Sequence, residues 1–252
     1  MPPEKPKEFI GQMELKNHNL TLPALVIAMG IAAAGFFVSE TLYKSKVALN
    51  TAEVKGLAER RVEADTAYWS IGYTVSGNHD SKISTLYQKS KLDQEKIINL
   101  LKESGFSHLE VTPGVINYKK KEYRDENQKL VETEHLLIGE IDVQTQKVKL
   151  VSQVRAKLNT LIAQGLSVQN NPPSYYFTKL NEIKPEMLKE ATQNARLAAN
   201  EFATHAGVSV GGIRSARQGG FVIRDRGQDY GDTRKIEKDV RVVTRVTFFL
   251  TE

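Results

Sequence analysis

An uncharged stretch near the N-terminus constrains this chain more than any other part of its sequence. From Leu20 to Val38 it runs LTLPALVIAMGIAAAGFFV, 19 residues without Asp, Glu, Lys or Arg. As a helix it would span roughly 28 Å at about 1.5 Å per residue, close to the roughly 30 Å hydrocarbon core of a bilayer. Pro23 falls in the first turn, where a missing N–H costs little. The stretch therefore predicts a transmembrane helix.

Two other interpretations of this stretch remain open. A buried core helix rarely stays uncharged on every face over such a length. A cleaved signal peptide is favoured by the alanines at 32–34, but its apolar region usually has roughly 7–15 residues. An uncleaved signal anchor fits best, because a long polar stretch precedes it. We predict a short cytoplasmic tail at 1–19, an anchor at 20–38 and a juxtamembrane linker at 39–50.

Charge and cysteine content exclude several classes of protein. The net charge of +5, from 35 basic and 30 acidic residues, is too small for a nucleic-acid-binding arm. Lysines lie on both sides of the apolar stretch, so the positive-inside rule does not orient it. Without cysteine the chain has no disulfide, thiolate metal site or cysteine nucleophile. We predict no cofactor, no metal and no nucleic acid as partner.

Periodicity predicts one α+β domain over residues 51–252. Apolar and polar residues alternate over 66–75, which predicts a half-buried strand, with 54–64 as its antiparallel partner. Three stretches carry apolar residues at helical spacing, and each ends at a glycine that can adopt the left-handed conformation. These glycines are Gly105, Gly165 and Gly207. The recurring joint of helix, glycine and short β-rich stretch suggests related β-α-β units.

The third helix and the last strand have the clearest patterns. The helix is predicted to begin at Lys184, because a proline and an acid are typical of a first turn. The segment 119–134 is highly charged and is predicted as an exposed hairpin connection. The helix stripe is Leu188, Ala191, Ala195, Ala198, Phe202 and Ala206. One face of the strand is Val240, Val242, Thr244, Val246, Phe248 and Leu250.

The order of these elements resembles that of the bacterial SIMPL-domain family. The most specific stretch is KPEMLKEATQNARLAANEFATHAGVSVGGIRS at 184–215, an Ala-rich helix followed by Ala-Gly-Val and a strand. TAYWSIGYTVSGN at 66–78 is similar to the family's second strand. The resemblance covers residues 51–252. The chain departs from the family in its long polar N-terminus and in the polar segment at 227–239.

The resemblance implies an envelope protein, because many family members bear an N-terminal signal or hydrophobic segment. It implies that the domain lies outside the cytoplasm. This chain would then be a single-pass protein of the bacterial inner membrane with its C-terminal domain in the periplasm. No catalytic residues are established for the family, so the resemblance supplies none.

No pattern in the sequence predicts catalysis. Residues 207–211 match the nucleophile elbow, but that motif needs a strand before Ser209 and a helix after it, and here the order is reversed. None of the five histidines pairs at metal-ligand spacing. We therefore predict a non-enzymatic protein that acts by binding or self-assembly. An enzyme or small-ligand binder with a site built from scattered residues is the alternative.

Arginines in the last third of the chain form a candidate binding surface. Aspartates and glutamates are interleaved with them, so a salt-bridged, solvated surface is the main interpretation. The alternative is an anion-binding surface for lipid headgroups or an acidic partner. The candidate residues are Arg214, Arg217, Arg224, Arg226, Arg241 and Arg245.

Consecutive aromatic residues indicate a second kind of interaction. Tyr175, Tyr176 and Phe177 make both faces of their strand apolar. The final strand also carries Val243 and Phe249 on its second face. One face could pack on the core and the other on a neighbouring subunit, which predicts a homo-oligomer. Burial between two layers explains the pattern equally well.

Overall fold

The computed structural model describes residues 21–46 and 50–251. Its first element, α1 (Thr21–Lys46), contains most of the predicted apolar stretch. The segment Leu22–Tyr43 is long and apolar enough to cross a membrane, and the rest of the described chain buries none of its residues. Residues 39–46 of the predicted linker continue this helix, and its residues 47–49 lie outside the described residues. The predicted tail and the first residue of the predicted anchor lie outside the described residues.

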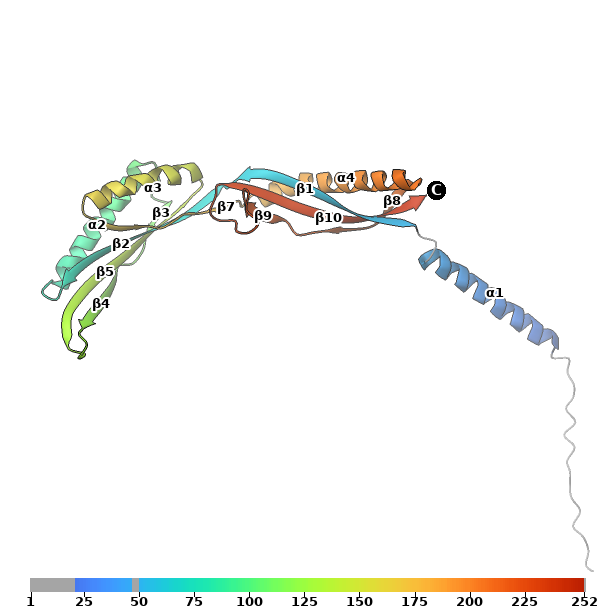
Figure 1. The fold of residues 1–252 in the computed structure, drawn as a ribbon, viewed down its shortest axis with the longest axis horizontal. Coiled ribbons are helices and arrows are strands. Elements are labelled where there is room, and N and C mark those ends of the chain that lie inside the picture. Colours follow the sequence, from blue (N-terminus) through green and yellow to red (C-terminus); the bar gives the residue numbers. More distant parts are fainter. Residues whose placement is uncertain (1–20, 47–49, 252) are drawn as a thin grey trace, which may run out of the picture.

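Strands from both ends of the domain form a first sheet, here called sheet A (Figure 1). β1 (Thr51–Glu63) pairs along its whole length with β10 (Glu237–Thr251). The other side of β10 pairs with β8 (Ser209–Gln218) and with β9 (Val222–Asp225). All of these pairings are antiparallel, and α4 (Leu180–Ala206) covers one face of the sheet.

Small side chains let α4 lie close to sheet A. Every fourth residue of the helix is buried, because residues four apart share a face. These are Met187, Ala191, Ala195, Ala199 and Ala203. They pack against inward-facing residues of β10 that include Val240 and Val246. A Cβ added at Gly56 of β1 would overlap the carbonyl oxygen of Ala191, so the close approach requires glycine there.

A second sheet, sheet B, lies at the end of the domain far from α1 (Figure 1). Its longest members are β2 (Thr66–Asn78) and β5 (Leu130–Thr145), which pair antiparallel. The short strands β6 (Ser167–Asn170) and β7 (Ser174–Tyr176) pair with β2. The other edge of β5 pairs with β3 (Val111–Pro113) and β4 (Asn117–Arg124).

Two helices, α2 (Ile83–Glu103) and α3 (Val148–Ala163), build the core of sheet B. Trp69 and Ile71 of β2 face this core and are almost fully buried. Each helix ends where the sequence predicts, at a glycine with positive φ. The α+β class, the antiparallel sheets and the three helices packed on them therefore agree with the prediction.

Several predictions about local structure are wrong. Residues 54–64 pair with β10, not with β2, because the chain leaves sheet A at Glu63 and enters sheet B at Thr66. The third helix begins at Leu180, so Pro185 lies inside it. The helix faces the sheet with a strict period of four, so the predicted stripe residues Ala198 and Phe202 are exposed.

The segment predicted as a hairpin connection is itself mostly strand. It supplies all of β4 after Tyr118 and the start of β5, and only residues 125–129 form the turn. All eight residues of β4 are exposed. A high charge density hid these strand residues, because most of their side chains are exposed and it is burial of one face that produces alternation in a sequence.

The passage between the two sheets is tied down by hydrogen bonds from residues 64 and 65. The Ala64 N–H donates to the Ile236 carbonyl at 2.7 Å, and the Asp65 N–H donates to the Tyr176 carbonyl at 2.9 Å. The Asp65 carboxylate accepts the N–H groups of Thr178 and Lys179 at 2.9 and 3.1 Å. One two-residue connection thus organises the start of α4 and the junction between sheets A and B.

Candidate binding site

The six arginines of the predicted anion-binding surface do not converge on one point. Arg241 and Arg245 lie on the face of β10 opposite α4, and Arg217 lies beside Arg245 on β8. Arg224 of β9 lies opposite Asp239 on β10. The structure therefore spreads Arg217, Arg224, Arg241 and Arg245 along the open face of sheet A.

Carboxylates of the same sheet engage half of these arginines. Arg241 and Arg245 approach glutamates of β1, at 3.4 Å from Glu59 and 3.1 Å from Glu53. Arg226 forms an ion pair of 2.5 Å with Glu237. Exposed pairs of this kind are typical of a solvated surface. Among the described residues, Arg214, Arg217 and Arg224 have no carboxylate within ion-pair distance, so an anion-binding role for this face stays a prediction.

The other side chains considered from the sequence occupy structural positions. Ser209 is the exposed first residue of β8, and only Gly207 and Val208 separate it from the end of α4. His79 contacts Asp80 at 3.0 Å, with both side chains about three-quarters exposed. The ring of His135 stacks on Tyr118 in the β4–β5 hairpin. Within the described chain, no group of three or more metal-binding side chains comes together.

The predicted aromatic strand packs largely within the chain. Tyr175 is buried, and its hydroxyl lies 3.0 Å from Ser152 Oγ on α3. Tyr176 points to the open face of sheet B, where its ring meets Tyr68 edge to face at 5.5 Å. Phe177 packs against the core of sheet A. The three residues thus bridge both sheets, and a subunit contact at this strand stays a prediction.

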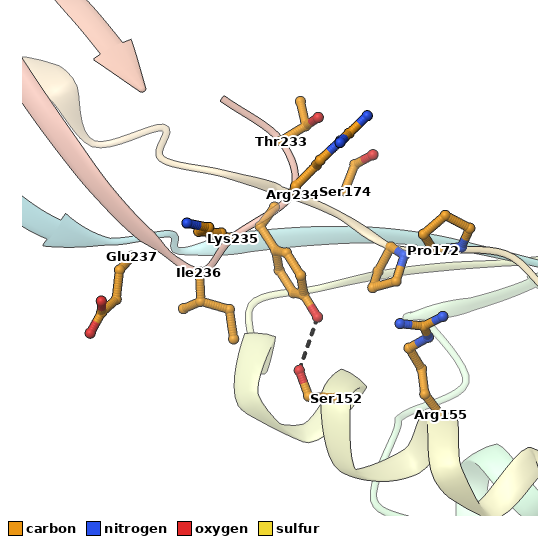
Figure 2. Close-up of a pocket in the computed structure, with 11 residues that line it drawn as sticks. Ser152, Arg155, Pro172, Ser174, Thr233, Arg234, Lys235, Ile236 and Glu237 are labelled. Atoms are coloured by element: carbon orange, nitrogen blue, oxygen red, sulfur yellow. Dashed lines mark hydrogen bonds between the residues drawn. The ribbon is translucent and has the colours of Figure 1, made fainter. Parts of the chain in front are cut away.

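A cavity of about 790 Å³ lies where sheets A and B meet, and we call it the junction cavity. One wall is α3, with Ser152 and Arg155, and a second is the proline-rich segment 172–175, which follows β6 and includes the start of β7. The third wall is the segment 233–237, which leads into β10 (Figure 2). Three separate stretches of chain therefore build this site, and none of them contains a motif.

Arg155 is held in place by a reciprocal pair of hydrogen bonds. Its Nε donates to Asn170 Oδ1 at 3.2 Å, and Asn170 Nδ2 donates to the Arg155 carbonyl at 3.0 Å. Figure 2 shows the guanidinium pointing from α3 toward Pro172. The terminal nitrogens of Arg155 have no hydrogen-bond partner among the described residues. The side chain is thus oriented while its outer edge stays free.

A buried ion pair shapes the wall that carries Arg234. Lys238 and Asp225 face each other across β9 and β10, 2.5 Å apart and with side chains 0% exposed. Lys238 also donates to the Asp232 carbonyl at 2.5 Å. The other Asp225 oxygen accepts the Arg234 N–H at 2.8 Å. The loop between β9 and β10 is therefore folded around one buried charge pair.

The same contacts account for the electrostatics of Asp225. Burial alone would raise the pKa of this carboxyl. Hydrogen bonds from Lys238 and from the backbone N–H groups of Arg234 and Lys235 outweigh burial and hold that pKa below its usual range. Asp225 therefore stays ionised, as the paired ammonium requires.

Sequence patterns pointed to only part of this site. Arg234 belongs to the basic region noticed in the sequence, but Arg155 lies in the middle of an amphipathic helix, where a charged residue ordinarily faces solvent. Nothing in the sequence connects Arg155 with Asn170 or either residue with the segment 233–237. The polar segment 227–239, in which the chain departs from the family, contains Arg234 and Lys238. It is the feature of the sequence that could have pointed to this cavity.

The fold and the cavity define a class: an α+β protein with two antiparallel sheets joined end to end, an apolar N-terminal helix and a polar cavity at the joint. The family model SIMPL, described as a protein of unknown function (DUF541), matches residues 52–248. The chain therefore belongs to the SIMPL family, as the order of its elements predicted. The match begins in β1 and ends in β10, so it includes both sheets. No curated protein matches the chain.

Proposed function

We propose that this chain is a single-pass inner-membrane protein that holds its SIMPL domain in the periplasm and acts by binding or self-assembly, not by catalysis. The observation that carries the anchoring is α1, whose apolar residues 22–43 are covered by no other part of the described chain. Exposed apolar surface costs about 25 cal/mol per Å² in water, so such a helix is stable in a bilayer. The chain belongs to the SIMPL family, and the envelope location that the resemblance implies supports the periplasmic side.

The long edge strand β1 supports self-assembly. Leu250 donates to the Asn50 carbonyl and Ala64 donates to the Ile236 carbonyl, so even-numbered residues of this strand bond to β10. Backbone groups of the odd-numbered residues therefore point away from the sheet. Among the described residues, only the Leu57 carbonyl has a partner there, the Asn194 side chain at 2.8 Å. A second strand can add to such an edge.

The anchor restricts how two copies can use this edge. A two-fold contact between β1 strands would be antiparallel, which puts their N-terminal ends about 40 Å apart at 3.3 Å per residue. Both anchors would then leave from opposite ends of the joint sheet. When two copies have the same orientation, β1 of one lies parallel to β8 of the other, because β1 and β8 are both antiparallel to β10. That arrangement keeps all anchors on one side.

Reporter fusions at the C-terminus test the topology. Alkaline phosphatase fused after Glu252 should be active and a fluorescent protein that folds only in the cytoplasm should be dark. Mass spectrometry of the membrane-extracted chain should show that residues 1–19 are retained. A cytoplasmic C-terminus or a chain cleaved after the alanines at 32–34 would refute the anchored periplasmic arrangement.

Light scattering on the full-length protein in detergent tests assembly. The substitution Lys55→Pro removes an outward N–H without touching the β10 ladder, and should reduce the oligomer to a monomer. Lys55→Ala keeps the N–H and is the matched control. A wild-type chain that stays monomeric at high concentration, or an oligomer unaffected by the proline, would contradict assembly through β1.

A further inference from the structure

The junction cavity holds more positive than negative charge. Arg155, Arg234 and Lys235 line it, against one acid, Glu237. That acid is already engaged by Arg226 outside the cavity at 2.5 Å. Among the described residues, no carboxylate lies within ion-pair distance of Arg155 or Arg234. The cavity therefore has two guanidinium groups whose charge the chain does not balance locally.

A second hollow in the same protein offers a comparison. A hollow of about 360 Å³ on the open face of sheet A is also rich in arginine. There Arg61 pairs with Asp239 at 3.0 Å and Arg241 with Glu59 at 3.4 Å. Two of the arginines in that hollow are therefore paired within the chain, whereas neither Arg155 nor Arg234 has a carboxylate partner among the described residues of the junction cavity.

Arg155 is oriented for an oxyanion. Because its Nε is bound to Asn170, the edge formed by its two terminal nitrogens remains for a ligand. A guanidinium edge binds the two oxygens of a carboxylate or phosphate with two parallel hydrogen bonds. The reciprocal Asn170 contact fixes the side chain before binding, which lowers the entropy lost when a ligand binds.

Arg234 and the remaining walls define the rest of the ligand. Figure 2 shows Arg234 on the segment opposite α3, near Ser174. The hydroxyl groups of Ser152, Ser174 and Thr233 and the apolar faces of Pro172, Pro173 and Ile236 line the space between. A volume of about 790 Å³ suits a small molecule with an apolar portion.

We propose that the junction cavity binds a small organic anion with at least one carboxylate or phosphate group, held by Arg155 and Arg234. This inference rests on the proposed function only in that the domain acts by binding. It depends neither on the membrane side nor on self-assembly, so its failure is distinguishable from theirs.

Calorimetric titration of the full-length protein in detergent tests the proposal with three probes. Succinate represents a carboxylate ligand, inorganic phosphate a phosphate ligand, and succinamide is the uncharged analogue. Succinate or phosphate should bind and succinamide should not, and the preferred anion identifies the chemistry of the acid group. Arg155→Gln and Arg234→Gln should each weaken binding about tenfold or more.

Two further variants separate a binding role from a structural one. Arg155→Lys keeps the charge but loses the Asn170 contact and the two-nitrogen edge, so it should bind more weakly than wild type while melting at the same temperature. Arg224→Gln removes an unpaired arginine outside the cavity and should bind like wild type. The proposal is overturned if neither anion binds, if the cavity variants bind like wild type, or if Arg224→Gln weakens binding equally.

Discussion

The buried pair Lys238–Asp225 offers the sharpest test of the structure. Both side chains are 0% exposed and lie 2.5 Å apart. The substitution Lys238→Met retains the length of the side chain and removes its charge. Asp225 then stays buried with only the backbone N–H groups of Arg234 and Lys235 as donors, and the Asp232 carbonyl loses its partner. The lost ion pair and the lost hydrogen bond both destabilise the folded state.

Removing one member of a buried ion pair costs about 3–5 kcal/mol. A chain of this size loses about 2–4 °C of melting temperature per kcal/mol, so Lys238→Met should melt about 6–20 °C below wild type. The double variant Lys238→Met with Asp225→Asn carries no buried charge and keeps an acceptor for the backbone N–H groups. It should recover part of the loss.

Calorimetry and urea unfolding of the full-length chain in detergent measure these differences. Arg226→Gln, which removes a neighbouring exposed ion pair with Glu237, is the control and should melt like wild type. The pKa of Asp225 is lowered, so its ionised form stabilises the protein above about pH 4 and this contribution is lost in acid. The difference in unfolding free energy between wild type and Lys238→Met should therefore become smaller at acid pH. If the two proteins differ in unfolding free energy by less than about 1 kcal/mol at pH 7, the buried ion pair is refuted.

Three further predictions concern other contacts. Gly56→Ala should destabilise the protein by about 1–3 kcal/mol or more, because the new methyl group overlaps the Ala191 carbonyl, whereas Gly212→Ala, with open space around it, should melt like wild type. Hydrogen bonds from Ser107, Thr145 and Lys147 outweigh burial and lower the pKa of Glu110 from 4.5 to about 2. The resulting stabilisation of about 3 kcal/mol should be present above pH 4.5 and should be lost as the pH falls toward 2. Urea titrations of Glu110→Gln should not show this loss of stability in acid. Asp65→Ala should cost about 1–2 kcal/mol and fray the start of α4 by amide exchange; unchanged exchange there would contradict its capping role.

Local patterns predicted much of the fold because each depends on residues close in the chain. The alternation over 66–75 reports that one face of β2 is buried, whichever strand lies beside it. The glycines at 105, 165 and 207 end their helices through their own backbone freedom, which neighbouring elements do not alter. The same locality explains the failure at α4. Helical spacing alone did not decide whether Ala198 and Phe202 or their neighbours Ala199 and Ala203 face the sheet. Packing against sheet A buries Ala199 and Ala203.

The sequence by itself determined an apolar helix long enough for a bilayer, three amphipathic helices with their C-terminal ends, and a set of alternating strands. Only the tertiary structure decided that β1 pairs with β10 at the other end of the domain, because strand partners are selected by packing over the whole chain. It alone placed Arg155 and Arg234 on opposite walls of one cavity. A site built from three distant segments leaves no local pattern, since its residues meet only after both sheets have formed.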